Sequence, residues 1–382
     1  MSKDKKRILF LTGTRADFGK LKSLMGAVVS SELFEIHVFV TGMHMLNRFG
    51  YTCAEVERMN YDNTFLFMNQ SGPDKMDRIL AKTILGLSDY VEQAKPDMII
   101  VHGDRVEALA GASVGSLNNI LTVHVEGGER SGTIDELIRH AVSKLSHVHL
   151  VANQAAMVRL IQMGELAESV FVIGSPDVDL MMSPDLPSIE SVKQRYDIKF
   201  SEYAIAMLHP VTTELDRLER DLDIFIQILQ KAERNFILIY PNNDSGSEEI
   251  IRRYQNLQLS NVRVIPSMRF EYFLSVLKHA QFIIGNSSAG IREAPYYRVP
   301  AIDLGSRQLN RSENPLIKNI DFDEEKILIA IKDLPQQTEK IMNDLDTEFG
   351  FGDSAKKFAD LIEGDSIWKT DIQKQFVDTT QE

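Results

Sequence analysis

Short apolar runs alternate with longer amphipathic stretches through the first half of the chain. The apolar runs predict buried strands, and the stretches between them have the length and period of helices. Strands are predicted at Ile8–Leu11, Glu35–Val40, Thr64–Met68, Ile120–Val125, Val148–Val151 and Val170–Ile173, and in the run from Met98 that leads into Asp104. Helices are predicted from the loop at 12–19 through Val29, at Lys75–Gln93, at Val106–Leu117 and from about Asp135. Repeated strand–helix units of this size indicate a parallel sheet with helices on both faces.

The second half repeats this alternation. Its predicted strands are Tyr203–Met207, Phe236–Tyr240, Val262–Ile265, Phe282–Ile284 and Ala301–Leu304. Between the halves, Ser183–Ser188 contains two prolines and polar spacers, which is typical of a domain boundary. We therefore predict an α/β protein of two doubly wound, Rossmann-like domains that face a cleft, covering residues 1–183 and 189–365. Beyond Lys356 the pattern predicts two helices, broken near Gly364.

Composition narrows the possible functions. A chain of 382 residues is long enough for two domains with separate cores. It carries 42 basic and 55 acidic residues, a net charge of -13, which argues against sequence-independent nucleic-acid binding. The single cysteine excludes an intrachain disulfide framework, and no apolar run approaches the ~18 residues of a membrane span. The apolar run after the first seven residues is too short for a signal peptide, so we expect a cytoplasmic protein.

Several polar side chains follow predicted strands, where ligands bind in open parallel sheets. These residues are Arg15, His44, Asp104, Glu126, His209, Asn242 and Ser287. Asp104 and Glu126 follow two such strands, and Glu129 and Asp135 come soon after. Carboxylates gathered in this way suggest general acid/base chemistry. For Asp135 an alternative is open, since acidic residues are also favoured in the first turn of a helix by its dipole.

The segment from Gly285 to Pro295, GNSSAGIREAP, follows a strand and is predicted to open a helix. Small residues, two hydroxyls and a helix N-terminus would suit a diphosphate. The alternative is an ordinary helix start, because Ser is a preferred N-cap. In the first half, Arg15 in Gly13-Thr14-Arg15 could contact the same phosphates.

Other motifs are excluded by spacing. Lys20 follows Gly19, but five residues separate Gly13 from Gly19 and Leu21 replaces the Ser or Thr of a Walker A loop. No Gly-x-Gly-x-x-Gly follows a strand, which excludes a nicotinamide dinucleotide fingerprint. His147 and His149 flank a strand without a third ligand at metal spacing, so we predict no metal site.

Six motifs together resemble the UDP-N-acetylglucosamine 2-epimerases, and more narrowly the hydrolysing enzymes of bacterial sialic acid and capsule biosynthesis. They occur in the family's order and span essentially the whole chain. The motifs are Gly13-Thr14-Arg15-Ala16-Asp17, His102-Gly103-Asp104-Arg105, His124-Val125-Glu126-Gly127-Gly128, His209-Pro210-Val211-Thr212, Tyr240-Pro241-Asn242-Asn243-Asp244 and the segment 285–295.

The resemblance implies a two-domain fold shared with one large class of glycosyltransferases (GT-B), in which a C-terminal helix, here about 366–382, packs back on the first domain. It implies anti elimination of UDP from UDP-N-acetylglucosamine (UDP-GlcNAc) to 2-acetamidoglucal, followed by addition of water and release of N-acetylmannosamine. No cofactor is implied. The expected partners are this small-molecule substrate and copies of the chain in a homodimer or homotetramer, with no nucleic acid and no membrane.

The resemblance also assigns residues. Those matching catalytic positions are Asp104, Glu126, Asp135, Arg139 and His209, and those matching nucleotide contacts are Arg15, Ser287, Ser288 and Glu293. Lys20, His44, Asn242 and Gly290, in or beside the same loops, complete the candidate binding set. The chain departs from the non-hydrolysing branch at Glu126–Arg130, where that branch has Glu-Ala-Gly-Leu-Arg, and at Asp135, where it has glutamate. Both departures fit the hydrolysing branch.

Three alternatives stay open from the sequence. The first is a glycosyltransferase of the same fold, which would release UDP only when an acceptor is present. The second is a sugar-nucleotide sensor without catalysis, against which the acid/base positions argue. The third is the same reaction on another donor, such as a diacetamido-trideoxy or GDP-linked sugar.

Overall fold

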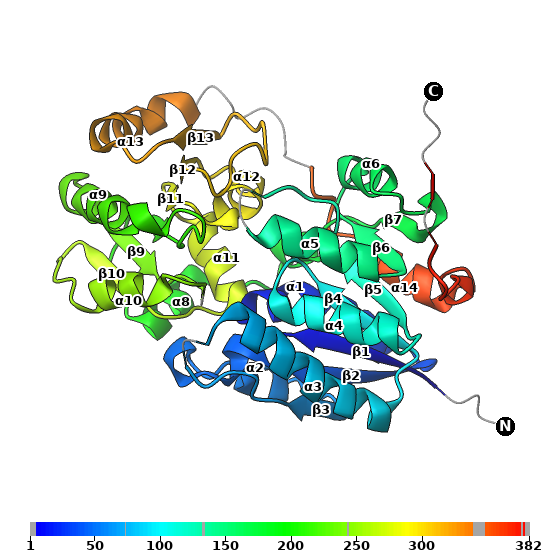
Figure 1. The fold of residues 1–382 in the computed structure, drawn as a ribbon. Helices are drawn as coiled ribbons and strands as arrows, with labels where there is room; N and C mark the ends of the chain where they lie inside the picture. The colour runs from blue at the N-terminus through cyan, green and yellow to red at the C-terminus, as the bar shows by residue number, and fades with distance from the viewer. Residues whose placement is uncertain are drawn as a thin grey trace. The chain divides into compact units, whose positions relative to one another are not determined.

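Two units of alternating strands and helices make up the computed structural model of the chain (Figure 1), which describes residues 5–72, 74–131, 134–242, 244–338, 348–375 and 377–378. Unit 1 comprises Met1–Glu129, Asp135–Met182 and Glu348–Glu382, and unit 2 comprises Arg130–Ile134 and Ser183–Thr347. The α/β fold predicted from the alternation is confirmed.

Unit 1 is built on a seven-stranded parallel sheet with the order β3-β2-β1-β4-β5-β6-β7. Its strands are β1 (Lys6–Thr12), β2 (Phe34–Val40), β3 (Asn63–Leu66), β4 (Met98–His102), β5 (Leu121–Val125), β6 (Val148–Val151) and β7 (Val170–Val172). The central strands are apolar at consecutive positions because both faces of the sheet are covered. Ile8 and Phe10 belong to the core on one face, whereas Leu11 lies on the other, beside Gly111.

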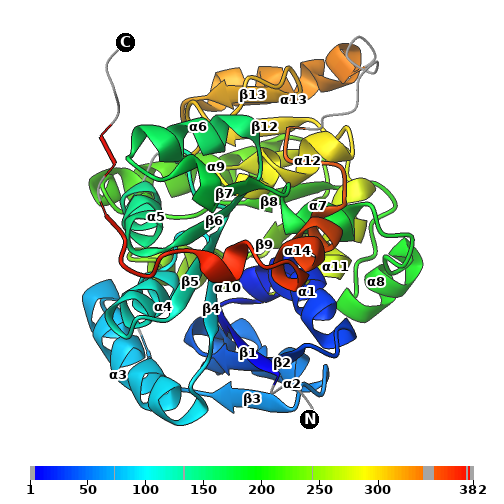
Figure 2. The same cartoon turned by 90° about the vertical axis from the view of Figure 1, so that its right-hand side faces the viewer.

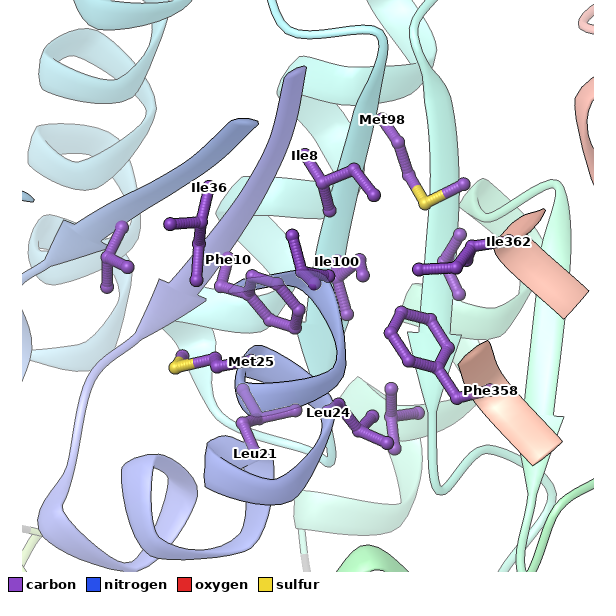
Figure 3. Packing of buried hydrophobic residues seen from close by; sticks show 14 of the residues in the cluster. Ile8, Phe10, Leu21, Leu24, Met25, Ile36, Met98, Ile100, Phe358 and Ile362 are labelled. Atoms are coloured by element: carbon purple, nitrogen blue, oxygen red, sulfur yellow. The ribbon is translucent and has the colours of Figure 1, made fainter. Parts of the chain in front are cut away.

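The helices of unit 1 pack on both faces of this sheet. They are α1 (Arg15–Ser30), α2 (Cys53–Glu57), α3 (Met76–Ala94), α4 (Val106–Leu117), α5 (Ile134–Leu145), α6 (Gln154–Gln162), α7 (Pro176–Met181) and α14 (Ser354–Glu363). α1, α7 and α14 contact one another, and α3 packs on α4. Leu21, Leu24 and Met25 of α1 are buried against β1 and β4 (Figure 3).

The chain returns to unit 1 earlier than expected, at Glu348. Helix α14 lies beside α1 (Figure 2), and its Phe358 and Ile362 enter the core of unit 1 (Figure 3). Of the predicted helix at 366–382, only Ile367–Lys369 is helical among the described residues, as one 3-10 turn, and residues 376 and 379–382 lie outside them. Two apolar side chains one turn apart on α14 are buried in this core, and Ile367 of the 366–382 segment joins it, with Trp368 and Ile372 packed against it. Polar contacts also hold this segment. His147 Nε2, for example, lies 3.1 Å from the carbonyl of Ile372.

Unit 2 repeats the plan with a six-stranded parallel sheet of order β10-β9-β8-β11-β12-β13. Its strands are β8 (Ala204–Met207), β9 (Phe236–Ile239), β10 (Val262–Ile265), β11 (Ile283–Gly285), β12 (Ala301–Leu304) and β13 (Ile317–Ile320). Its helices are α8 (Ile189–Tyr196), α9 (Leu218–Lys231), α10 (Ser247–Gln255), α11 (Phe270–Lys278), α12 (Glu293–Tyr296) and α13 (Glu324–Thr338). The sequence prediction missed β13, whose Ile-Lys-Asn-Ile is only half apolar.

Both sheets share the strand order 3-2-1-4-5-6 of a Rossmann fold, with β7 added at the edge of unit 1. The order reverses between β1 and β4 in unit 1 and between β8 and β11 in unit 2, and such switch points are where ligands bind. At the second of these points Gly285 is required, because a Cβ there would lie 1.8 Å from the carbonyl oxygen of Met207.

Candidate functional site

Five charged side chains meet at the switch point of unit 1. His102 ends β4, and its Nε2 lies 3.0 Å from Glu126 Oε2, while its Nδ1 lies 3.5 Å from Asp17 Oδ1. Lys20 Nζ lies 2.8 Å from Asp177 Oδ2 and 4.0 Å from Glu126 Oε2. Lys20, Glu126 and Asp177 are buried, as is His102. Glu126, which the sequence analysis predicted at the end of a strand, therefore lies within a cluster of positively and negatively charged side chains.

Glu126 itself is held in an uncommon backbone conformation. Its φ is 64°, in the left-handed region that side chains other than Asn and Asp seldom adopt. The backbone N–H donates to Leu150 in β6 (2.9 Å), and the hydroxyl of Ser175 donates to Oε1. Strained residues gather at functional sites, where surrounding contacts enforce the conformation. The strain thus supports a functional role for this carboxylate.

Asp104 and Arg139 form a second pair at the same edge of the sheet. Nη2 of Arg139 donates to Asp104 Oδ2, and Nη1 donates to the carbonyl of Glu129 (3.3 Å). Asp135 lies four residues before Arg139 in α5, in the first helical turn, and is buried. The structure therefore brings the three predicted carboxylates Asp104, Glu126 and Asp135 to the ends of β4 and β5 and the start of α5.

Arg15 and His44 make contacts inside unit 1. The guanidinium of Arg15 pairs with Glu55, with Nε and Nη2 donating at 3.1 and 2.6 Å. His44 is fully buried, with Nε2 at 3.0 Å from Thr12 Oγ1 and Nδ1 at 2.6 Å from Thr52 Oγ1. Burial lowers the pKa of His44 to about 4, so the ring is neutral. The described contacts make His44 a support of the loop after β2, whereas a direct contact with a nucleotide stays a prediction.

The loops after β1 and β2 rest on a buried carboxyl group that the sequence analysis did not single out. Glu107, in the first turn of α4, lies against Gly13, and a Cβ on Gly42 would come within 2.8 Å of its Oε1. Asn69 Nδ2 donates to the same oxygen (3.4 Å) while its Oδ1 accepts from Gly42 N–H (3.1 Å). Burial raises the pKa of Glu107. A carboxyl group in this place fixes two loops of the site.

At the switch point of unit 2, Asn286 is the centre of the described hydrogen bonds. The backbone N–H of His209 donates to Asn286 Oδ1 (2.7 Å), and Asn286 Nδ2 donates to the His209 carbonyl (2.9 Å). The ring Nδ1 of His209 accepts from the backbone N–H of Asn242 (3.2 Å). Arg307 Nη1 and Gln308 Nε2 donate to the Asn286 carbonyl at 3.2 and 2.9 Å. His209 and Asn242, two of the candidate residues, therefore contact each other directly, and Asn286, one residue before the candidate serines, anchors the backbone of His209.

The sequence predicted that the serine loop opens a helix, but the helical segments that follow are short. Ser287 Oγ accepts from the N–H of Ala289 (3.3 Å) and caps the single 3-10 turn Ser288–Gly290, which is followed by the four-residue helix α12. The helix dipole contribution expected there is therefore small, because the dipole grows with aligned peptides. Ser287, Gly290 and Glu293 are buried, and Ser288 is half-buried.

Most of the residues that the sequence analysis missed share one feature. His102 ends β4, Asn286 directly follows β11, and Asp17 and Glu107 lie in the first turns of α1 and α4, whereas Arg307 and Gln308 lie between β12 and β13. His102, Asp17 and Asn286 stood inside quoted motifs, so a rule that weighed every polar residue there would have found them. Ser175 and Asp177 follow β7 and gave no such signal. Among the described residues, no group of three His, Cys, Asp or Glu side chains is arranged to hold a metal ion.

Comparison with known proteins fits this arrangement. A family model described as UDP-N-acetylglucosamine 2-epimerase matches residues 27–363. The UDP-N-acetylglucosamine 2-epimerase of Neisseria meningitidis serogroup B is 47% identical over 98% of this chain and 99% of its own. The chain belongs to the UDP-N-acetylglucosamine 2-epimerase family. A second family relative, the UDP-N,N'-diacetylbacillosamine 2-epimerase (hydrolyzing) of Legionella pneumophila, is 32% identical over 86% of this chain and 88% of its own.

A solved structure shows the same fold in this family. The UDP-GlcNAc 2-epimerase from Neisseria meningitidis bound to UDP-GlcNAc matches with a TM-score of 0.78 at 18% identity, covering 94% of this chain and 99% of that one. The two Rossmann-like sheets are therefore those of the epimerase fold. No helix among the residues described for this family member is long and apolar enough to cross a membrane.

Proposed function

We propose that this chain is a hydrolysing UDP-GlcNAc 2-epimerase, which converts UDP-GlcNAc and water to UDP and N-acetylmannosamine for sialic acid biosynthesis. Elimination breaks the C2–H bond and the C1–O bond, the electron pair forms the C1–C2 double bond, and UDP leaves. Hydration then adds a hydroxyl at C1 and a proton at C2 from the opposite face. The reaction balances with water alone, so no cofactor enters the proposal.

The observation that carries the proposal is the set of three carboxylates at one edge of the unit 1 sheet, of which Glu126 and Asp135 are buried and Asp104 is half-buried. Two proton transfers at C2 and one activation of water need several acid/base groups. Asp104, Glu126 and Asp135 are the groups we assign to these steps. Their surroundings differ, since Arg139 neutralises Asp104 whereas Glu126 contacts His102, Lys20 and Ser175. Different surroundings are how carboxylates acquire different roles.

We assign recognition of the nucleotide to unit 2. Ser287 and Ser288 offer hydroxyl donors, and Arg307 supplies a positive charge beside Asn286. Such donors stabilise the negative charge that develops on a departing diphosphate. The two remaining candidate catalytic residues are Arg139 in unit 1 and His209, which follows β8 in unit 2.

The hydrolysing branch is proposed on two grounds. The chain has Glu126-Gly127-Gly128-Glu129-Arg130 and Asp135 where the non-hydrolysing branch differs, and the Legionella relative is described as hydrolyzing. The name of that relative also favours one second candidate, the same reaction on a UDP-linked diacetamido-trideoxy sugar. Offering both donors in one competition assay separates them, since the true substrate is consumed first at equal concentration. Release of UDP without any acceptor separates both from a glycosyltransferase.

The experiment that tests the proposal is incubation of the purified chain with UDP-GlcNAc in D2O, followed by NMR. We expect UDP and N-acetylmannosamine in equal amounts, with deuterium at C2 of the sugar. In water labelled with ¹⁸O, the label should appear in the C1 hydroxyl and not in UDP. Protium retained at C2, or UDP-N-acetylmannosamine as the product, would overturn the scheme. We also propose a homo-oligomer, and light scattering that gives a 43.2 kDa monomer would contradict this.

A further inference from the structure

We propose that His102 is a positioning residue of the unit 1 site, a positively charged imidazolium that keeps Glu126 ionised and fixed for proton transfer. The kinetic part of this inference rests on the proposed function. Its structural part, the charge on His102 and its dependence on two carboxylates, does not.

The geometry points to a clamp with an imidazole at its centre. Glu126 Oε2 lies 3.0 Å from one ring nitrogen and Asp17 Oδ1 lies 3.5 Å from the other. The two carboxylates come from different elements, Asp17 from the first turn of α1 and Glu126 from the end of β5. In both contacts the ring nitrogen and the carboxylate oxygen are close enough for an ion pair, but they are not aligned as a hydrogen bond. In catalytic sites such contacts commonly shorten only when substrate is bound.

A neutral imidazole would be unstable in this position. A neutral ring has one N–H, so it would present an unprotonated nitrogen to one of the carboxylates, whereas the protonated ring presents an N–H to each. Burial alone lowers the pKa of His102, but the charges of Glu126 and Asp17 outweigh it and raise the pKa to about 9. For Asp17, burial raises the pKa, yet His102 with smaller help from Arg105 leaves it lowered.

Further charged groups surround the clamp, and most of them reinforce it. Lys20 of α1 lies 4.0 Å from Glu126 and 2.8 Å from Asp177 of α7, so its charge is shared between two carboxylates. His124 of β5 is neutral, because burial lowers its pKa to about 3. Glu107 of α4 interacts with Asp17, and burial raises its pKa, which limits its negative charge. Of the two histidines His102 and His124, His102 is thus the one that carries a charge, and it contacts both the Glu126 and the Asp17 carboxylates.

The role that follows concerns the charge state of Glu126. A carboxylate removed from water tends to take up a proton, which would end its use as a base. An adjacent imidazolium opposes this uptake and, with Ser175 bound to the other oxygen, fixes the orientation of the carboxylate. His102 itself need not touch the sugar, so it acts through Glu126. The clamp explains why a buried, strained glutamate remains available for proton transfer at neutral pH.

The structural part is tested on the wild-type protein by NMR, through the pH titration of the His102 ring carbon and nitrogen signals. We expect a protonated ring at pH 7.5 that titrates near pH 9, and a lower titration point in the double variant Asp17→Asn, Glu126→Gln. A ring that is neutral at pH 7.5 in the wild type would overturn the proposal. This measurement requires no turnover, so it remains valid even if UDP-GlcNAc proves not to be the substrate.

The kinetic part is tested with His102→Gln, which keeps a polar side chain but carries no charge. We expect kcat to fall at least 100-fold at pH 7.5, while the dissociation constant for UDP changes less than threefold. The matched control is His37→Gln, because His37 is also a buried strand histidine beside a carboxylate, with Nε2 at 2.8 Å from Glu35. It lies in the middle of β2, and its variant should keep the wild-type kcat.

The pH profile separates a charge role from a merely structural one. Wild-type kcat should decrease as pH rises through about 9, because His102 loses its proton there. In His102→Gln this decrease should be absent while the smaller kcat stays level. A variant with wild-type kcat, or one that keeps the alkaline decrease, would contradict the proposal. An inactive wild type would instead contradict the proposed function.

Discussion

Charged side chains meet at the switch point of unit 1, whereas hydrogen bonds between amides and carbonyls dominate that of unit 2. In unit 1, His102, Glu126 and Lys20 stand within 4.0 Å of a partner of opposite charge. In unit 2, His209 and Asn286 exchange two hydrogen bonds, and Arg307 donates to the carbonyl of Asn286. The strand order that creates both places is the same.

This difference shows that the fold fixes where a ligand can bind, and the side chains fix what happens there. We assign proton transfer to unit 1, because groups of opposite charge lie close together there. We assign recognition of the diphosphate to unit 2, because a diphosphate already carries its charge and needs hydrogen-bond donors. Each prediction below changes residues of one unit and leaves the other unit unchanged.

The largest effect should follow Glu126→Gln. The amide keeps the shape of the side chain but cannot accept the C2 proton, so we expect kcat to fall by roughly 10²–10⁴-fold, the usual contribution of general acid/base catalysis. The rate of UDP release from UDP-GlcNAc measures the loss, with circular dichroism to confirm the fold. A variant that keeps more than a tenth of the wild-type rate would remove Glu126 from the proton-transfer steps.

A smaller effect, on the other side of the division, is expected from Ser287→Ala combined with Ser288→Ala. Each lost hydrogen bond to a charged phosphate costs about 1.5–3 kcal/mol, before water replaces any of it. UDP should therefore bind at least about tenfold more weakly in calorimetry. Asn286→Ala is not a suitable control, since it removes a bridge between β8 and β11. An unchanged UDP affinity in the folded double variant would show that these hydroxyls do not contact phosphate.

The smallest effect should be on stability, at the buried carboxyl group of unit 2. Burial raises the pKa of Asp303, in β12, from 3.8 to about 6, against the hydrogen bond from Asn319. The folded state therefore binds this proton more tightly than the unfolded chain does. The stability that the proton contributes is present below pH 4 and is lost as pH rises through 6.

Asp303→Asn should remove this pH dependence. At pH 7 the variant should unfold with a free energy higher than that of the wild type, by an upper bound of about 3 kcal/mol for a shift of two units. Urea unfolding at pH 5 and pH 7 measures the difference, which should be larger at pH 7. A variant less stable than the wild type at pH 7 would mean that ionised Asp303 is paired favourably, for example with Arg307 or Arg311.

The sequence was sufficient for the architecture and for part of the site. Apolar runs fixed the strands because the interior of a parallel sheet tolerates few polar residues, and strand ends then located Asp104, Glu126 and His209. It was not sufficient where a partner comes from a distant element. Ser175 reaches Glu126 from 49 positions away, and Phe358 joins a core begun by Ile8.

A second limit was the orientation of side chains inside a correctly located motif. Within unit 1, Arg15 pairs with Glu55, a partner that the sequence could not indicate, and its contact with phosphate stays a prediction. His102 stood in a quoted motif without a role, because its charge depends on two carboxylates that only the fold brings together. The helix propensities of the residues also could not reveal that the serine loop is followed by a single 3-10 turn.

Titration of UDP into Glu126→Gln by calorimetry tests the division between the two switch points most directly. The account predicts that this variant, although deficient in turnover, binds UDP with the affinity of the wild type within threefold, because the groups that recognise the nucleotide are assigned to unit 2. A loss of UDP affinity of tenfold or more in folded Glu126→Gln would contradict it.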